Sequence, residues 1–306
     1  MRLDQVLVLS LSVMLSSCSM IDSSHINSNH FVAEAREGIY LISTEECQLM
    51  YTSQVLHSDS PIKCDRLKKV VFPFSPLVNK ASKTVDIPSE VDEQMSQMGT
   101  LVVLDVLAEE VLSLFNVLYQ FQFPLKQAIP VEYFSEREKL NDHLNNSYAF
   151  DSRLMTNSTA WSEHAYGVAI DINPFQNPYI YIGDDPSALV IPKSAVGQYL
   201  NRAKYRPGKV TRSGMAEEVV IEFAKHGFIV WGGDWDRPVD YMHFQVGSRH
   251  FIDKLTSLPL ASASALFNDY VIQINRCFDI AKDTLGFNDQ ELIRKFCVDT
   301  ITTKFE

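Results

Sequence analysis

Two short stretches of the chain, WSEHAYGVAID and, far downstream, DYMHF, carry the residue types best suited to chemistry. Together they contain two histidines and two aspartates. Two neutral imidazoles and one carboxylate, from His164, Asp171 and His243, form a three-ligand set typical of catalytic zinc, which keeps a fourth position open for water. Asp240 remains as a candidate general base beside that set. These four residues therefore predict a metal-assisted hydrolytic site.

The spacing within each stretch favours strands that present these side chains together. Val168–Ile172 and Met242–Val246 both alternate, as half-buried strands do. Gly167 permits a tight bend that brings the first histidine back over the metal side of its strand. Asp240 lies three residues before the second histidine, so a bend or bulge must turn its carboxylate toward the metal. The alternative, two ordinary strands with scattered polar residues, does not account for this combination.

The motifs S-E-H-A-Y-G-x-A-x-D-I-N-P, W-G-G-D-W and D-Y-M-H-F also resemble a known family. It is the VanY-type family of D-alanyl-D-alanine carboxypeptidases, with the L-alanyl-D-glutamate cell-wall peptidases and the vancomycin-resistance dipeptidases. The similarity extends over residues 61–246 and is strongest over 149–244. It implies an α+β fold, in which helices flank a small, mainly antiparallel sheet (the DD-peptidase or hedgehog-like fold).

The resemblance assigns a role to each candidate residue. It implies that His164, Asp171 and His243 bind Zn²⁺ and that Asp240 is the general base. The family's A-F-N-C-R run appears here as A-F-D-S-R, so Arg153 is expected to polarise the substrate carbonyl. A planar guanidinium suits either a carbonyl oxygen or a terminal carboxylate near a metal. A surface arginine paired with a carboxylate is the alternative for this residue.

Three departures from the family pattern leave the proposed ligands untouched. Ser152 replaces a common cysteine, which removes a possible disulfide, and Trp161 replaces a common leucine. Gln245 replaces a common glutamate after H-F. Because no ligand or base is lost, the pattern favours an enzyme over a binding protein.

The resemblance implies a zinc-dependent peptidase that hydrolyses peptidoglycan stem peptides, with D-Ala-D-Ala-type carboxypeptidase activity favoured. Three alternatives stay open: an L,D-endopeptidase of the cell wall, a zinc hydrolase of another envelope substrate, and a non-catalytic peptidoglycan-binding lipoprotein. The residues expected to contact substrate are Ser162, Tyr179, Trp231 and Tyr241. Tyr179 lies within a proline- and tyrosine-rich region, 173–212, which is expected to be a long loop beside the substrate groove.

Composition limits the possible partners. The chain has 306 residues, 46% hydrophobic residues and a net charge of −11. Nucleic acid is not expected as a partner, because phosphate binding requires a basic surface. A short peptide remains an acceptable substrate, and a monomer is expected.

The N-terminal residues resemble a bacterial export signal. Met1 and Arg2 precede a short apolar run, Val6–Leu15, which is too short to span a bilayer as a helix. The following Leu-Ser-Ser-Cys resembles a lipobox, so Cys18 is expected to be lipidated. The predicted location is the cell envelope, lipid-anchored and facing the periplasm or the cell exterior, with the outer membrane favoured. An ordinary signal peptide with a chance cysteine is the alternative.

The other four cysteines predict two disulfides, since their number is even and the protein is expected to be exported. Of the three possible pairings, Cys47–Cys64 and Cys277–Cys297 are favoured because each joins cysteines close in sequence. A zinc site that uses Cys47, His57 and Cys64 is disfavoured because its spacing matches no zinc-ribbon pattern.

The chain divides by composition into successive segments. These are a signal peptide (1–17), a lipidated cysteine with a flexible tether (18–30), an N-terminal extension (31–95), a zinc peptidase domain (96–250) and a C-terminal helical extension (251–306). Within the domain, Asp105 is expected to cap a helix and Val131–Phe134 to form a strand. The C-terminal extension has two apolar stripes at helical spacing and is predicted to be a helical hairpin.

Overall fold

The computed structural model describes residues 36–77, 97–134, 144–156, 158–184, 187–283, 286 and 289–306. The predicted signal peptide and the lipidation site at Cys18 lie outside these residues. The described helices are α1 (Thr44–Thr52), α2 (Ala108–Gln120), α3 (Val196–Tyr199), α4 (Val220–Lys225), α5 (Arg249–Ser257), α6 (Leu260–Asp283) and α7 (Gln290–Phe305). None of them is long and apolar enough to cross a lipid bilayer.

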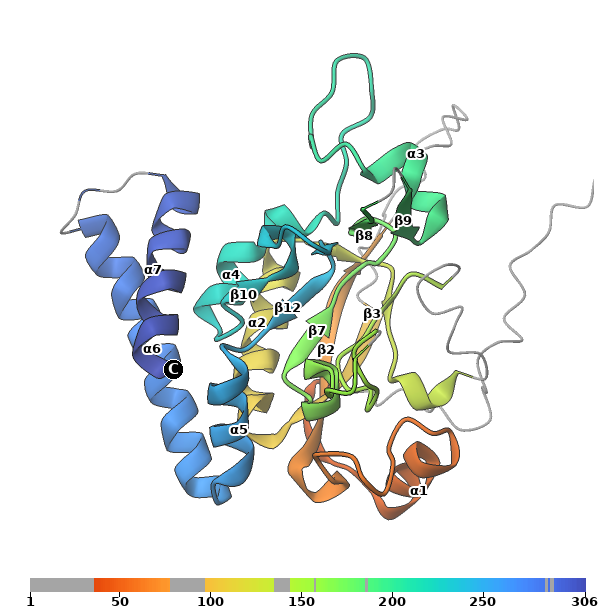
Figure 1. Ribbon diagram of the computed structural model, residues 1–306, viewed down its shortest axis with the longest axis vertical. Helices are drawn as coiled ribbons and strands as arrows, with labels where there is room; N and C mark the ends of the chain where they lie inside the picture. The colour runs from red at the N-terminus through yellow and green to blue at the C-terminus, as the bar shows by residue number, and fades with distance from the viewer. Residues whose placement is uncertain are drawn as a thin grey trace, which may run out of the picture.

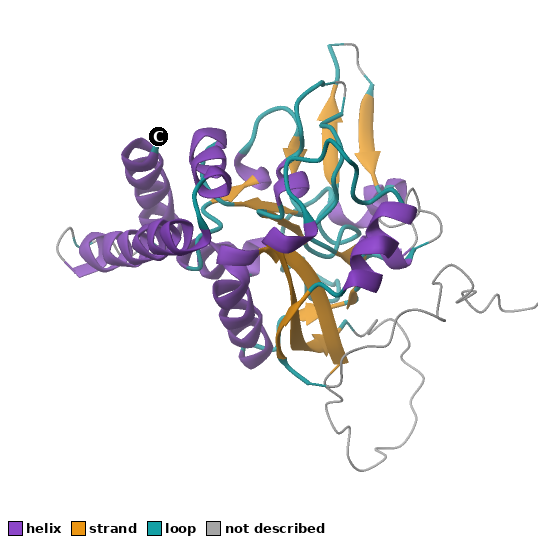
Figure 2. Ribbon diagram, turned by 90° about the horizontal axis from the view of Figure 1, so that it is seen from below, coloured by secondary structure: helices purple, strands orange, loops and turns teal. Residues whose placement is uncertain are grey.

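The strands form small sheets, mostly antiparallel. They are β1 (Gly38–Leu41), β2 (Leu67–Pro76), β3 (Gln97–Leu104), β4 (Pro124–Leu125), β5 (Gln127–Ala128), β6 (Asn146–Ser147), β7 (Ala169–Asp171), β8 (Tyr179–Ile182), β9 (Ala188–Ile191), β10 (Val230–Trp231), β11 (Val239–Asp240) and β12 (His243–Gln245). Their order is β1-β2-β3 with β4 beside β2, β10-β12-β7, β11-β8-β9, and β5-β6. This architecture confirms the predicted α+β class with C-terminal helices (Figures 1 and 2).

The longest pairing in the fold joins β2 to β3 along their whole overlap, from Leu67↔Leu104 to Phe74↔Gln97. The apolar side of α2 covers this sheet, and the ring of Phe115 stacks on Phe72 with centroids 4.0 Å apart. The boundary expected between the N-terminal extension (31–95) and the peptidase domain (96–250) therefore falls between two strands of one sheet.

Two local expectations in this region are wrong. Asp105 does not cap a helix through its side chain, because its carboxylate forms an ion pair with Arg66 at 2.7 Å. Val131–Phe134 is not a strand: Val131–Tyr133 forms a 3₁₀ helix, η4. At Asp105, the contact with Arg66, 39 residues away, outweighs the local pattern.

The region 173–212 is more ordered than the predicted long loop. It contains the hairpin of β8 and β9, paired from Tyr179↔Ile191 to Ile182↔Ala188, followed by α3. β11 adds to this hairpin, with Val239 and Asp240 opposite Ile180 and Tyr179. The hairpin of β8 and β9 projects from one side of the molecule in Figure 2.

The C-terminal hairpin of α6 and α7 packs on α4 and α5 at one side of the molecule (Figure 1). Asp289 caps α7 by accepting hydrogen bonds from the amides of Glu291 and Leu292. Both predicted disulfides are confirmed: Cys47–Cys64 links α1 to the 3₁₀ turn η2 (Cys64–Arg66) before β2, and Cys277–Cys297 joins α6 to α7. The disfavoured zinc site at the first pair is therefore excluded.

Candidate functional site

A short 3₁₀ turn, η6 (Glu163–Tyr166), positions His164. Ser162 caps its start, and its hydroxyl accepts a hydrogen bond from the His164 amide at 3.4 Å. Gly167 ends it in the left-handed region, at φ 68°. A Cβ on Gly167 would lie 2.7 Å from the amide nitrogen of Leu104, so this predicted bend requires glycine.

The His164 ring is buried and its tautomer is fixed by the backbone. Its Nδ1 lies 2.6 Å from the carbonyl oxygen of Ala149, which can only accept, so Nδ1 carries the proton. The lone pair of Nε2 therefore points at Asp171, whose Oδ1 is 3.2 Å away. This Nε2 makes no hydrogen bond of good geometry within the described residues.

The second histidine reaches the same oxygen from the neighbouring strand. The register of β12 on β7 places His243 directly opposite Asp171. His243 Nδ1 lies 3.1 Å from Asp171 Oδ1, while its Nε2 lies 2.9 Å from Gln245 Oε1. Because an amide oxygen only accepts, Nε2 donates to Gln245 and Nδ1 keeps its lone pair toward Asp171.

These three side chains fit a divalent metal ion. Their ligand atoms all lie within 4.8 Å of one another. Two imidazole lone pairs facing one carboxylate oxygen are three acceptors, which repel unless a proton or a cation lies among them. The separations of 3.1 and 3.2 Å approach the ~3.3 Å between ligands of a tetrahedral zinc with ~2.0 Å bonds. His164, Asp171 and His243 could therefore hold the ion together.

The pKa values show how strongly this cluster favours positive charge. Burial alone would raise the pKa of Asp171, but the imidazoles of His164 and His243 outweigh burial and hold it well below its ordinary range. Burial alone would lower the pKa of His243, but its hydrogen bond to Asp171 raises it to about 9. A bound cation would replace the protons that this site otherwise attracts.

Asp240 approaches the cluster from a different sheet. It ends β11, and a tight turn leads from there to His243 at the start of β12, which is the predicted bend. Burial and the charge of Asp171 raise the pKa of Asp240 to about 7. Its Oδ1 is buried without a hydrogen-bond partner among the described residues. This carboxylate is therefore available as a proton acceptor near neutral pH.

The turn η9 (Gly232–Asp234) packs directly on Asp240. A Cβ on Gly232 would lie 2.3 Å from the Asp240 carbonyl oxygen, so only glycine permits this close approach. The next residue, Trp235, places its ring 5.3 Å from the His243 ring. One short turn thus contacts both the candidate base and a candidate ligand.

Arg153 lies at the edge of the site. Its Nε is 3.4 Å from Asp151 Oδ2, and its side chain is 42% exposed. Burial would lower its pKa, but its interactions with Tyr148, Asp171 and Asp240 raise it, so the guanidinium stays charged. This cation faces the same carboxylates that surround the candidate metal position.

A pocket of about 960 Å³ opens over these side chains. Its lining consists of Tyr148, Asp151, Arg153, Met155, Thr156, Ser162, Glu163, His164, Asp171, Tyr179, Tyr181, Leu189, Ile191, Trp235, Pro238, Asp240, Met242 and His243. The predicted ligands, the base and the arginine all line this pocket. Two of the four expected substrate contacts, Ser162 and Tyr179, also line it.

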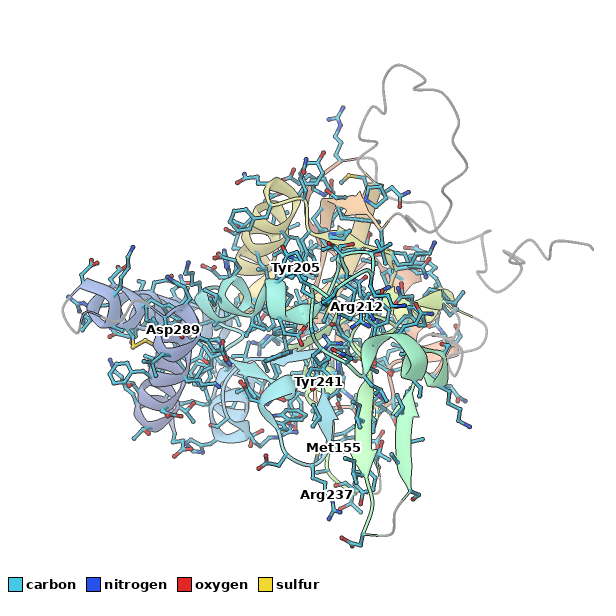
Figure 3. All side chains as sticks on the ribbon, turned by 90° about the horizontal axis from the view of Figure 1, so that it is seen from above. Met155, Tyr205, Arg212, Arg237, Tyr241 and Asp289 are labelled. Atoms are coloured by element: carbon cyan, nitrogen blue, oxygen red, sulfur yellow. A yellow bond between two sulfur atoms is a disulfide. The ribbon has the colours of Figure 1, made fainter. Side chains whose placement is uncertain are left out.

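The other two expected contacts, Trp231 and Tyr241, lie outside the pocket lining. Trp231 is 7% exposed, and its ring stacks toward Phe244 in the core, because β10 pairs Trp231 with Phe244 rather than with His243. The ring of Tyr241 lies under the guanidinium of Arg202, 4.2 Å away, outside the pocket lining (Figure 3).

Among the pocket residues without a predicted role, two aromatic residues contact the candidate ligands. Tyr148 stacks on His164 with ring centroids 5.0 Å apart, and it directly precedes the A-F-D-S-R run. Trp235 is the second tryptophan of W-G-G-D-W, beside the candidate ligand His243. Adjacency to the motifs was the available signal, but aromatic residues alone do not distinguish core from pocket.

The fold and the site together define a candidate metal-dependent hydrolytic centre: two imidazoles, a shared carboxylate, a second acid and an arginine around one pocket. A family model described as D-alanyl-D-alanine carboxypeptidase matches residues 156–246, less than a third of the chain. The match confirms the predicted resemblance and contains His164, Asp171, Asp240 and His243, while Arg153 lies just before it. No curated protein and no solved structure matches the chain.

Proposed function

We propose that this protein is a zinc-dependent peptidase that hydrolyses peptidoglycan stem peptides, as a D-Ala-D-Ala-type carboxypeptidase. The observation that carries the proposal is the convergence of two imidazole lone pairs on one oxygen of Asp171, beside an acid whose pKa is about 7. The family match over the same residues supports peptides of this class as the substrate.

The chain's own residues supply binding and proton transfer. The chemistry that a bound zinc ion adds is Lewis acidity, which polarises a carbonyl and lowers the pKa of water to about 7. Asp240 accepts the proton of the attacking water and passes it to the leaving amine. Arg153 donates hydrogen bonds to oxygen atoms of the substrate. The indole of Trp235 and the β8–β9 hairpin limit solvent access beside these groups.

Arg153 also bears on which peptide bond is cleaved. It is the one lysine or arginine among the residues that line the described pocket. A carboxypeptidase needs a cation for the terminal carboxylate, and Arg153 meets that need only if the carbonyl oxygen is polarised without it. If Arg153 binds the carbonyl instead, the described pocket offers no second lysine or arginine for the terminal carboxylate. The cleavage product then decides between the carboxypeptidase and the alternative function, an L,D-endopeptidase.

The test is mass spectrometry of defined muropeptides after incubation with the protein, with zinc and with a chelator. Zinc-dependent loss of one alanine supports the carboxypeptidase. Zinc-dependent cleavage between L-Ala and D-Glu supports the endopeptidase. His164→Ala should abolish either activity together with zinc binding, while His250→Ala, at an exposed histidine outside the pocket, serves as the matched control. No cleavage by zinc-loaded protein would favour a non-catalytic peptidoglycan-binding role.

We further propose that the protein acts in the cell envelope, anchored by a lipid on Cys18. The lipobox-like sequence before Cys18 and the two disulfides support an exported protein. Cells that express the full chain should incorporate labelled palmitate into it, and Cys18→Ser should prevent this. Equal labelling of both proteins would contradict the anchor.

A further inference from the structure

Arg294, on α7, forms an ion-pair cluster with Asp234 and Glu291. Its guanidinium donates to both carboxylate oxygens of Asp234, at 2.8 and 3.0 Å, and to both of Glu291, at 3.0 and 2.7 Å. The side chain of Arg294 is fully buried, whereas Asp234 and Glu291 are 35% and 49% exposed. Two-point pairing of this kind fixes orientation as well as distance.

The charge of Arg294 is retained despite burial. Burial alone would lower its pKa, but the hydrogen bonds that it donates to Glu291 and Asp234 outweigh burial and raise the pKa. The guanidinium also lies 5.9 Å from the ring of Trp231, whose indole N–H donates to the Tyr241 carbonyl at 3.0 Å. Asp234 and Trp231, with which Arg294 forms an ion pair and a ring contact, both belong to the W-G-G-D-W motif.

That segment forms one side of the pocket. Asp234 ends η9, whose first residue, Gly232, packs on the backbone of Asp240. Trp235 follows Asp234 directly and lines the pocket beside His243. A displacement of Asp234 would therefore move the support of the candidate base and the neighbour of a candidate ligand together.

Arg294 lies well outside the region that the family model matches, which ends at residue 246. The disulfide Cys277–Cys297 joins α7 to α6 three residues after Arg294. Asp289, labelled in Figure 3, caps the start of α7. α7 also packs on α4 (Figure 1). The disulfide to α6 and the packing on α4 therefore fix the position of α7, which carries Arg294.

We propose that Arg294 is a positioning residue for the pocket: through Asp234 it holds η9 and Trp235 against Asp240 and His243. The C-terminal hairpin is then a working part of the site rather than an appended extension. The catalytic consequence rests on the proposed function, whereas the effect on η9 does not.

The first measurement is amide hydrogen exchange in the full chain for Asp234→Asn and Arg294→Met. Both variants should exchange faster over residues 232–243, while the paired strands β2 and β3 keep their protection. Lys295→Met is the matched control, because Lys295 is the next residue of α7, is 60% exposed and pairs only with Glu291 among its salt bridges. If Arg294→Met does not fold, Asp234→Asn decides, because it leaves the buried arginine paired with Glu291.

The second measurement is turnover of muropeptides by the zinc-loaded proteins. We expect kcat to fall tenfold to hundredfold, the range for small misplacements of catalytic groups, with KM changed less than threefold. Arg294→Lys should restore part of kcat. Unchanged exchange over residues 232–243 in Asp234→Asn, or equal loss of protection throughout the chain, overturns the proposal. If the wild-type protein has no turnover, the proposed function fails, and the exchange result alone judges the positioning role.

Discussion

Two aspartates of the site have opposite electrostatic environments, although both are largely withdrawn from water. Burial alone would raise the pKa of Asp171, but the neighbouring imidazoles of His164 and His243 hold it far below its ordinary range. Asp240 has no such partner at Oδ1, and burial together with the charge of Asp171 raises its pKa to about 7. Divergent pKa values in neighbouring carboxyl groups commonly separate a ligand from a proton carrier. This difference supports Asp171 as the candidate ligand and Asp240 as the candidate base.

Asp240→Asn should separate metal binding from catalysis. The amide keeps the shape of the side chain but cannot accept a proton, so kcat should fall by about 10²–10⁴-fold. Zinc content, measured by inductively coupled plasma mass spectrometry, should stay at one ion per chain. Asp236→Asn provides the control, because Asp236 is exposed and does not line the pocket. Near-normal turnover of Asp240→Asn would show that the base is another group.

Gln245 determines how His243 presents its lone pair. The Gln245 side chain accepts from His243 Nε2 at 2.9 Å and donates to the Gly247 carbonyl at 3.3 Å. Gln245→Leu should weaken zinc binding by about 10–100-fold, as losses of such supporting hydrogen bonds do. Gln245→Glu should retain affinity because a carboxylate also accepts from Nε2. Competition with a fluorescent zinc chelator measures the zinc affinity of both variants. Equal zinc affinity in Gln245→Leu and the wild-type protein would show that Gln245 does not orient His243.

At this scale the sequence predicted the clustering of the candidate ligands better than the lining of the pocket. His164, Asp171 and His243 were predictable because strand alternation and a glycine bend are local patterns. The placement of Trp231 was not, because its direction depends on the pairing of β10 with β12, which joins residues distant along the chain. The supporting bond of Gln245 was likewise missed, although the departure from the family pattern marked the position.

At the scale of elements, the turn η6 and its final glycine set the position of His164. Leu104, at the end of β3, donates its amide to the Gly167 carbonyl at 2.9 Å, which ties the turn to the central sheet. Gly167→Ala would place a methyl group 2.7 Å from that amide nitrogen at a φ of 68°. The left-handed backbone alone costs an alanine about 1–2 kcal/mol.

Gly167→Ala should therefore lower the free energy of unfolding by at least about 1–2 kcal/mol. It should also weaken zinc binding, because His164 must shift. Thermal unfolding and zinc titration measure the two effects. Gly197→Ala is the control, since no atom lies within 4 Å of a Cβ added there and its φ is not positive. An unchanged melting temperature in Gly167→Ala would contradict the close packing of η6 on β3.

Elements defined by local patterns were predicted well, and elements fixed by distant contacts were not. The C-terminal hairpin and its Asp289 cap follow from periodicity and residue type. By contrast, Asp105 lost its expected capping role to Arg66, a partner 39 residues away. The β8–β9 hairpin was expected as a loop, because its short strands lack a strong alternating pattern.

At the scale of the whole molecule, protons and metal compete for the same folded state. In the metal-free protein, burial or a neighbouring charge raises the pKa values of Glu132, Asp240 and His243 into the range from about 7 to about 9. Burial raises the pKa of Glu132 from 4.5 to about 7. Burial and the charge of Asp171 raise the pKa of Asp240 from 3.8 to about 7. Burial alone would lower the pKa of His243, but Asp171 raises it from 6.5 to about 9. Each therefore binds protons more tightly in the folded chain than in the unfolded one.

The sign of the pH dependence follows from this excess of bound protons. Where the folded state binds more protons than the unfolded state, stability falls as pH rises. The contributions of Asp240 and Glu132 are lost as pH rises through about 7, and that of His243 as it rises through about 9. The melting temperature of the metal-free protein, measured in chelator, should therefore decrease steadily from pH 5.5 to pH 8.5. Glu132→Gln should flatten part of this decrease, because Glu132 lies outside the pocket and loses its titration.

The stabilisation by zinc should have the opposite pH dependence to the stability of the metal-free protein. Because zinc ligands must be deprotonated, the increase in melting temperature on adding zinc should grow between pH 5.5 and pH 8.5. Differential scanning calorimetry with matched zinc and chelator samples at each pH measures that increase. His243→Ala should abolish it, whereas Glu132→Gln should leave it intact, which separates the metal site from the rest of the fold. A zinc effect that is equal at both ends of this pH range would mean that these imidazoles are not the ligands, because a site of two histidines and one carboxylate must release protons when it binds a cation.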